Sequence, residues 1–229
     1  MRQELVVLPT ASKRLTQPRW PLGNIFAIVL SFLSAAVLIC TWYSTRTHVL
    51  DLVNEQQVLN SGLYTEWAKG NVLVLIRHAE RCDRSHNACL NDPTGITVAG
   101  SQVAAEVGKG IQALGLKKTQ MLSSPQVRTE QTARFAFNEA IPTQNWLNQC
   151  DSHFSGNAIN HKQPGHNMVL ITHSGCIDQL ERSLRVPGNE RASAYASALF
   201  VTVDISGNAR ILGQMNANTW HNLTTYSGN

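Results

Sequence analysis

The chain has 229 residues, of which 43% are hydrophobic and 15% are charged. This length allows one domain, or one domain with an appendage, and the composition excludes a disordered chain. The net charge of +4 arises within the first 46 residues, and the rest of the chain has equal numbers of acids and bases. A neutral body gives no reason to expect a nucleic-acid partner.

The amino-terminal segment contains a long apolar run. No charged residue occurs between Arg19 and Arg46, and residues 25–43 are dominated by Ile, Val, Leu, Phe and Ala. At ~1.5 Å per helical residue, this run spans roughly the ~30 Å hydrocarbon core of a bilayer. Trp20 and Trp42 stand at its two ends, as interfacial aromatic residues do. The basic residues in front of the run predict a cytoplasmic amino terminus and an exported body.

A buried helix and a cleaved signal peptide are the alternatives to a membrane span, and both fit this run less well. A buried helix of a soluble domain seldom stays uncharged over such a length. A cleaved signal peptide has only ~7–15 apolar residues followed by a small-residue cleavage site, and lipoprotein-type cleavage before Cys40 requires a small residue where Ile39 stands. The predicted organisation is a cytoplasmic segment (1–22), a transmembrane anchor (23–45), a stalk or covering helix (46–70) and a globular domain (71–229).

The cysteines also favour an exported domain. Apart from Cys40 in the apolar run, the chain has Cys82, Cys89, Cys150 and Cys176, an even number that allows three pairings. Cys82 and Cys89 lie in one loop, where a local disulfide forms easily, and the other two each follow a predicted strand end and can meet at one sheet edge. A zinc site is the alternative, but no Cys-x-x-Cys spacing is present. Disulfides persist in oxidising compartments, in agreement with export.

The apolar run at residues 72–76 predicts a strand that is buried on both faces, as in a parallel sheet. The run ends at Arg77 and His78. Open α/β sheets bind their ligands at the carboxyl ends of such strands. An imidazole beside a guanidinium there suggests attack on an anionic centre, although an ordinary surface histidine in a polar loop is the alternative.

A loop at residues 81–95 follows, rich in Asp, Asn, Pro and Gly. Arg81 and Arg84 in this loop are candidates for substrate contact, because the proposed disulfide closes the loop beside the end of the strand. Thr97 is the expected N-cap of the next helix. Residues 119–122 predict a second strand.

The second predicted strand leads into a helix that carries Arg128 in its first turn. Helix amino termini attract phosphate, and an arginine there adds a bidentate clamp. The run at residues 168–171 predicts another buried strand, which ends directly before His173. His173 therefore repeats the placement of His78.

The remaining predicted elements have weaker signals. They are a strand at 141–147, a polar loop at 148–165, a helix at 177–184 and two closing strands at 198–203 and 210–215. Together the elements predict an α/β fold, a three-layer α/β/α sandwich with a mostly parallel central sheet. Arg77, His78, Arg128 and His173 should then share one sheet edge and form a site for a compact anion, most simply phosphate.

These motifs resemble those of the histidine phosphatase superfamily, which has the phosphoglycerate-mutase-like fold. Arg77-His78-Ala79-Glu80 is similar to its Arg-His-Gly signature, with Ala in place of Gly, and Thr97-Val98-Ala99-Gly100 to its Leu-Thr-x-x-Gly segment. The stretch from Ser123 to Ala133 resembles its Ser-Ser-x-x-x-Arg-x-x-Gln-Thr-Ala block, and Thr172-His173 holds the place of the second histidine. The resemblance covers roughly residues 71–203.

Within the superfamily, a longer run resembles the bacterial lipopolysaccharide core heptose phosphate phosphatases. This run comprises residues 77–85, Cys89-Leu90 and residues 94–97. Enzymes of that group also have an amino-terminal hydrophobic segment. The resemblance implies a membrane-anchored phosphatase in the periplasm, on the inner membrane, with a phosphorylated envelope saccharide as its partner.

The resemblance also implies a mechanism. Neutral His78 attacks phosphorus and forms a phosphohistidine, which water hydrolyses, while Arg77, Arg128 and His173 neutralise the phosphoryl oxygens. Neither a metal nor another cofactor is expected. Asp151 is the nearest match to the carboxylate that protonates the leaving group in the family, with His153 and Glu80 as rivals. Two alternatives stay open: a histidine phosphatase for a phosphoprotein or small phosphate ester, and a non-catalytic phosphate-binding module.

Overall fold

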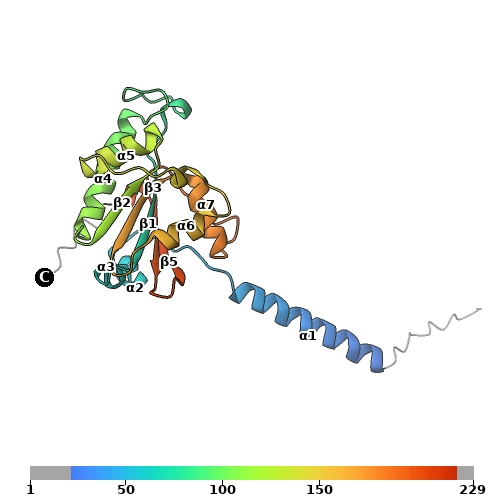
Figure 1. Ribbon diagram of the computed structural model, residues 1–229. Coiled ribbons are helices and arrows are strands. Elements are labelled where there is room, and N and C mark those ends of the chain that lie inside the picture. Colours follow the sequence, from blue (N-terminus) through green and yellow to red (C-terminus); the bar gives the residue numbers. More distant parts are fainter. Residues whose placement is uncertain (1–21, 221–229) are drawn as a thin grey trace, which may run out of the picture. The chain divides into compact units, whose positions relative to one another are not determined.

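The computed structural model describes residues 22–220 (Figure 1). Most of the predicted cytoplasmic segment lies outside the described residues. The chain divides into two compact units, residues 1–45 and 46–229.

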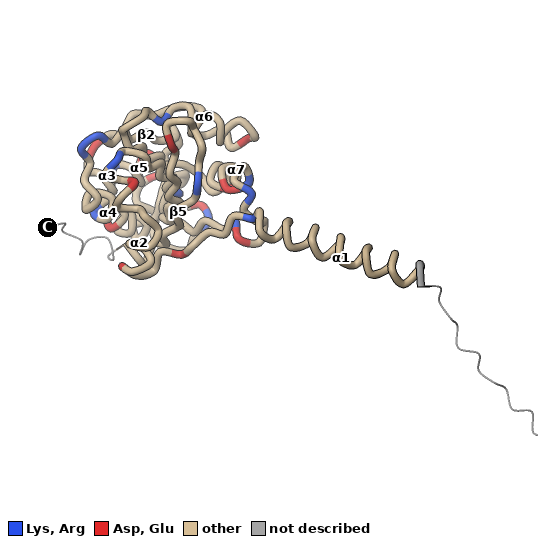
Figure 2. The backbone as a smooth tube through the Cα atoms, turned by 90° about the horizontal axis from the view of Figure 1, so that it is seen from below, with Lys and Arg blue, Asp and Glu red and all other residues tan. Residues whose placement is uncertain are grey.

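The described part of the first unit forms helix α1 (Leu22–Ser44), which carries no charged residue (Figure 2). Its residues Asn24–Ser44 are long and apolar enough to cross a membrane, and none of this span is buried within the protein. Its large apolar side chains are exposed, and Phe26 and Phe32 are about three-quarters exposed. Exposed apolar surface of this extent is typical of a membrane span. A signal sequence has the same character.

The second unit is built on a five-stranded open sheet with strand order β2-β3-β1-β4-β5. Its strands are β1 (Val72–Arg77), β2 (Thr119–Ser123), β3 (Asn167–Thr172), β4 (Ala198–Val203) and β5 (Ala209–Met215). Strands β2, β3 and β1 are parallel, β4 is antiparallel to β1, and β5 is antiparallel to β4. Only β4 therefore runs against the others, and the prediction of a mostly parallel sheet is confirmed.

Helices cover both faces of this sheet (Figure 1). One face carries α2 (Glu55–Ser61), α3 (Leu63–Ala68), α4 (Val98–Ala113) and α5 (Val127–Phe137), and the other carries α6 (Phe154–His161) and α7 (Ser174–Ser183). Strand β1 is buried on both sides. Val74 packs in the hydrophobic core on the face covered by α2–α5, and Leu75 packs in the core on the face covered by α6 and α7. Each such fully buried side chain contributes roughly 1.5–3 kcal/mol to stability. The predicted three-layer α/β/α sandwich is confirmed.

Residues 46–70 lie against the globular core. The backbone of Leu50 and Leu52 exchanges hydrogen bonds with Gln214 (2.8 and 2.7 Å), which pairs the outer edge of β5. Asn54 then caps α2 through its side chain, and Gly62, at φ +79°, joins α2 to α3.

Two weak segments of the sequence fold differently from the prediction. Residues 141–147 form no strand but a single bridge between Ser123 and Thr143, followed by a 3₁₀ helix, Asn145–Asn148. Pro142 cannot donate to a ladder, and the bridge is closed by its carbonyl and by the Gln144 N–H. The predicted polar loop at 148–165 contains α6, whose buried Phe154 and Ala158 are one helical turn apart.

Candidate active site

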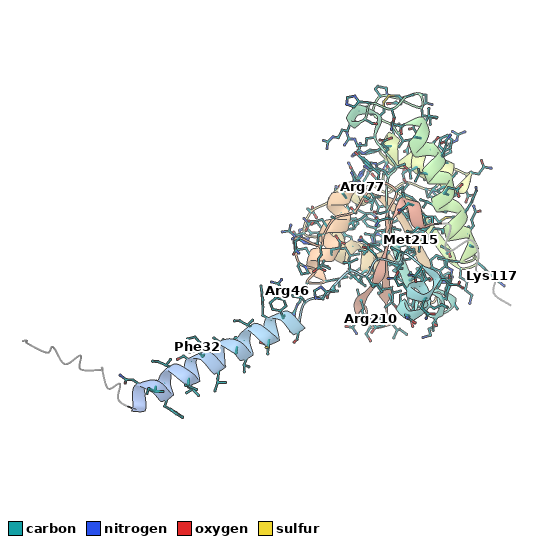
Figure 3. The ribbon with its side chains drawn as sticks, turned by 180° about the vertical axis from the view of Figure 1, so that it is seen from behind. Phe32, Arg46, Arg77, Lys117, Arg210 and Met215 are labelled. Atoms are coloured by element: carbon teal, nitrogen blue, oxygen red, sulfur yellow. A yellow bond between two sulfur atoms is a disulfide. The ribbon has the colours of Figure 1, made fainter. Side chains whose placement is uncertain are left out.

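The parallel strands bring their carboxyl ends to one edge of the sheet. Arg77 ends β1 and pairs in register with Thr172, the last residue of β3, while Ser123 at the end of β2 pairs with Ile171. Figure 3 shows Arg77 at this edge and Arg210 at the opposite one. The residues that follow Arg77, Thr172 and Ser123 therefore converge, and they include both predicted histidines.

His78 is a buried imidazole with a defined tautomer. It is 3% exposed, and its Nδ1 lies 2.9 Å from the Ala79 carbonyl oxygen. A carbonyl only accepts, so Nδ1 carries the proton and Nε2 keeps its lone pair. The pKa of His78 is lowered to about 3, chiefly by burial and in smaller part by the nearby His173, Arg128 and Arg77. His78 is therefore neutral at physiological pH, as a nucleophile must be.

His173 faces His78, with the two ring centroids 5.4 Å apart. Its Nε2 lies 2.9 Å from the Ser124 hydroxyl, and its Nδ1 lies 3.5 Å from Nη2 of Arg128. Burial and then the charge of Arg128 lower the pKa of His173 to about 4. Without an anion, His173 is therefore neutral. A bound dianion opposes both the Arg128 and the Arg77 contributions and favours the imidazolium.

Arg128 lies in the first turn of α5, as predicted from its motif. Thr132, one turn later, accepts from the Ala79 N–H at 2.9 Å and donates to the Arg128 carbonyl at 2.6 Å. This hydroxyl ties the start of α5 to the backbone that follows His78. Arg128 Nε is buried and, within the described part of the chain, has no partner. The guanidinium thus keeps donor capacity for an anion.

Arg77 is held by a segment that carries no signal in the sequence. Its Nη1 donates to the Ser193 carbonyl at 2.6 Å, and its guanidinium carbon lies 3.9 Å above the centre of the Tyr195 ring. The ring of Tyr195 is also 5.7 Å from that of His78. Residues 185–197 contain no strand, helix or motif pattern, so nothing in the sequence indicated Tyr195. Ser124 was likewise missed, although it belongs to the Ser-Ser motif.

The loop after His78 is fixed by two features. The predicted disulfide between Cys82 and Cys89 is present. Glu80 accepts hydrogen bonds from the side chains of Ser85 (2.9 Å), Asn87 (2.9 Å) and Thr97 (2.7 Å). The bonds from Asn87 and Thr97 are the main cause of its lowered pKa. Glu80 is therefore a structural anion, and as a rival for the general acid it fits poorly.

The same loop adds positive charge near the site. Arg81 pairs with Asp83 (Nε to Oδ1, 2.8 Å), and Arg84 is exposed. Both arginines lie close enough to lower the pKa of Arg77 and Arg128, although burial is the larger cause for each. Two guanidiniums beyond those of Arg77 and Arg128 leave this edge strongly positive, with Asp83 as the acid that faces them.

None of the contacts described above involves Asp151. It is exposed, and its Oδ1 accepts from the His153 N–H at 2.8 Å. The predicted disulfide between Cys150 and Cys176 is present and holds this segment to the first turn of α7, beside His173. The assignment of Asp151 as the acid stays a prediction. Among residues 22–220, no group of three or more His, Cys, Asp or Glu is placed to hold a metal ion.

Comparisons with known proteins connect this site to a family. No family model matches the chain. A lipopolysaccharide core heptose(II)-phosphate phosphatase of Escherichia fergusonii is 38% identical over 117 residues, which cover 50% of this chain and 60% of that protein. The protein of the same name from Salmonella typhimurium is 39% identical over 117 residues and is covered to 58%. The matched segment is thus less than two thirds of each relative.

A solved structure shows the same fold. The protein histidine phosphatase SixA, complexed with tungstate, superposes with a TM-score of 0.53 at 19% identity, over 64% of this chain and 97% of that one. The resemblance in the motifs is confirmed: this chain has the histidine phosphatase fold and is a sequence relative of the lipopolysaccharide core heptose(II)-phosphate phosphatases.

Proposed function

We propose that this protein is a phosphomonoesterase that uses His78 as its nucleophile and removes phosphate from a heptose of the lipopolysaccharide core. The observation that carries the proposal is the His78 imidazole, which is neutral, buried and protonated on Nδ1. Its free Nε2 lies beside a second histidine and two arginines that can neutralise a phosphoryl group.

The reaction has two steps. Nε2 of His78 attacks phosphorus in line and the ester oxygen leaves, which gives a phosphohistidine. Water then attacks phosphorus, the P–N bond breaks, and its electron pair returns to Nε2. Arg77, Arg128 and protonated His173 bind the equatorial oxygens, where charge accumulates in both transition states. Positioning and electrostatics supply most of what phosphoryl transfer needs.

The relatives and the charge of the site support the substrate. Both curated relatives are named as heptose(II)-phosphate phosphatases of the lipopolysaccharide core. Arg81 and Arg84 add positive charge beyond what one phosphate requires, and we assign them to the rest of an anionic saccharide. Two disulfides and the apolar helix α1 agree with a periplasmic domain anchored in the inner membrane.

The test begins with the full-length chain in detergent and p-nitrophenyl phosphate. Wild type should release p-nitrophenol, His78→Ala should lose at least ~10³-fold in kcat/KM, and His166→Ala, an exposed histidine before β3, should match wild type. Acid quenching during turnover should trap an acid-labile phosphoprotein that His78→Ala lacks. Binding of phosphate without hydrolysis would instead favour the non-catalytic module.

The substrate is tested separately. Core oligosaccharide from a strain deleted for the gene should gain the mass of one phosphate on heptose, and purified protein should remove it. An unchanged mass, with full activity on the aryl ester, would redirect the proposal to a phosphoprotein or a small phosphate ester.

A further inference from the structure

The proposed reaction leaves one proton unassigned. A sugar hydroxyl is a poor leaving group, so its oxygen must be protonated as the P–O bond breaks. The acids of this edge are poorly placed to do so. Glu80 accepts three hydrogen bonds from side chains, and Asp83 is paired with Arg81. Asp151 is exposed and bonded to its own loop.

The protonation states of Glu80 and Asp83 also argue against these two carboxylates as the proton donor. The hydrogen bond from Asn87 is the largest cause of a lowered pKa at Glu80, and the bond from Arg81 is the largest at Asp83. Both groups are therefore ionised at neutral pH. An ionised carboxylate has no proton to give.

Tyr195 is held against the nucleophile by backbone contacts. The Arg77 N–H donates to the Ser197 carbonyl at 2.9 Å, and the Ala196 N–H donates to the His78 carbonyl at 3.3 Å. The Arg77 side chain donates to the Ser193 carbonyl at 2.6 Å. Three hydrogen bonds thus fasten residues 193–197 to the Arg77-His78 pair. The centre of the Tyr195 ring lies 3.9 Å from the guanidinium carbon of Arg77 and 5.7 Å from the centre of the His78 ring.

The polar end of Tyr195 lies among guanidiniums. Burial lowers the pKa of Arg77, and a contact with the Tyr195 phenol raises it. A guanidinium carries only donors, so Arg77 leaves the phenolic hydrogen of Tyr195 available to another partner. Arg81 and Arg128 are also within electrostatic range of the phenol oxygen.

We propose that Tyr195 is the general acid of this site and donates its phenolic proton to the leaving oxygen of the substrate. The inference rests on the proposed function. As His78 Nε2 bonds to phosphorus, the P–O bond breaks with its electron pair on oxygen, and the Tyr195 proton moves to that oxygen. In the second step, the Tyr195 phenolate takes a proton from the attacking water while the P–N bond breaks. Each turnover restores the phenol and consumes one water.

The dependence on the leaving group tests this proposal. p-Nitrophenolate leaves without protonation, whereas the alkoxide of a sugar or glycerol does not. Tyr195→Phe keeps the ring that stacks on Arg77 and removes only the hydroxyl. We expect kcat/KM for glycerol 2-phosphate and for core heptose phosphate to fall by ~10²–10⁴-fold, and kcat/KM for p-nitrophenyl phosphate to stay within about threefold of wild type. Each kcat/KM value reports the steps up to and including cleavage of the P–O bond. Slower hydrolysis of the phosphohistidine therefore does not change it.

Controls separate a proton donor from a structural residue. Tyr64 lies on α3, at the amino end of β1, and Tyr64→Phe should leave kcat/KM unchanged for both the alkyl and the aryl esters. Tyr195→Ala should lower kcat/KM for both classes of ester, because Arg77 then loses the aromatic ring on which its guanidinium stacks. Equal activity of Tyr195→Phe and wild type on the alkyl esters overturns the proposal, as does an equal loss on both ester classes. If Asp151→Asn instead lowers kcat/KM for the alkyl esters and not for p-nitrophenyl phosphate, Asp151 is the general acid. If wild type hydrolyses neither ester, the proposed function itself has failed.

Discussion

The Nδ1 atom of His78 lies 2.9 Å from the carbonyl oxygen of Ala79, the next residue in the chain. This local contact fixes which ring nitrogen carries the proton before any substrate is present. An imidazole free to choose its tautomer would present the wrong nitrogen part of the time. The geometry of the site therefore predicts protonation states that can be measured.

The first prediction concerns His78 itself. Burial lowers its pKa to about 3, so between pH 5 and 8 the ring should remain neutral with its proton on Nδ1. Two-dimensional ¹⁵N–¹H spectra of histidine-labelled protein should show one ring that does not titrate in this range and has Nε2 unprotonated. A His78 signal that moves with a midpoint near 6.5 contradicts the assignment.

The second prediction concerns His173. Its pKa of about 4 in the free protein means that it is neutral at pH 7. A dianion bound beside it should raise that pKa, so binding should draw a proton from solution. Tungstate, which does not titrate near neutrality, is the suitable probe. Calorimetry in buffers of different ionisation enthalpy should show uptake approaching one proton per site at pH 7, and His173→Asn should abolish it. Binding by wild type without uptake would exclude this role.

The third prediction concerns Arg128. Lysine preserves the charge but lacks the planar fork that binds two phosphoryl oxygens at once. Arg128→Lys should lower kcat/KM by ~10²-fold, a loss typical of one transition-state donor. Arg134→Lys, in the last turn of the same helix, is the matched control and should have little effect. Steady-state assays with p-nitrophenyl phosphate decide the matter, and equal activity of the two variants would remove Arg128 from the phosphate pocket.

The sequence was most informative where one local signal sufficed. The run Val72–Ile76 is buried on both faces, so its apolar composition alone predicted a central parallel strand. The N-cap at Thr97 is equally local: its side chain accepts from the Gly100 N–H at 2.9 Å. Gly100 follows from packing, since a Cβ there would lie 3.1 Å from the Glu80 backbone nitrogen. Such motifs can be recognised in the sequence because the contacts behind them require particular residue types at fixed positions.

The sequence failed where a contact depends on tertiary structure alone. Tyr195 reaches the site because Arg77 pairs with Ser197, more than a hundred residues away in the chain. Its own segment has no periodicity that could be read. Pro142 stands in a strand-like run, and only the structure shows that this run makes a single bridge to Ser123 at the end of β2. Site residues on strand ends were predictable, whereas residues delivered by irregular loops were not.

The fourth prediction compares the two disulfides. Cys150 and Cys176 are 26 residues apart and Cys82 and Cys89 are 7 apart. Chain entropy then assigns about 3–4 kcal/mol to the longer loop and about 2 kcal/mol to the shorter. Replacing both cysteines of a pair by serine should lower the unfolding free energy in that order, as measured by urea titration. The shorter bridge also holds Arg81 and Arg84, so its loss should raise KM for core heptose phosphate more than for p-nitrophenyl phosphate. An equal rise in both would mean that the loop does not contact the saccharide.

The fifth prediction concerns Glu181 on α7, which is 1% exposed. Within residues 22–220, neither carboxylate oxygen of Glu181 has a hydrogen-bond partner. Burial, reinforced by Asp178 and opposed by Arg191, raises its pKa from 4.5 to about 7. Between these values the unfolded chain releases the proton and the folded protein keeps it. The stability tied to this group is therefore complete below pH 4.5 and is lost as the pH rises to about 7 and above.

Glu181→Gln carries an uncharged side chain of the same shape at every pH. Its unfolding free energy should equal that of wild type near pH 4.5 and exceed it by on the order of 2–3 kcal/mol at pH 8. The exposed Glu139→Gln should show no such divergence. Because the two histidines of the site titrate identically in both proteins, their contribution cancels in the difference. Curves that stay parallel from pH 4.5 to 8 would mean that Glu181 is solvated or paired in solution, and that the carboxylate is accommodated as an anion.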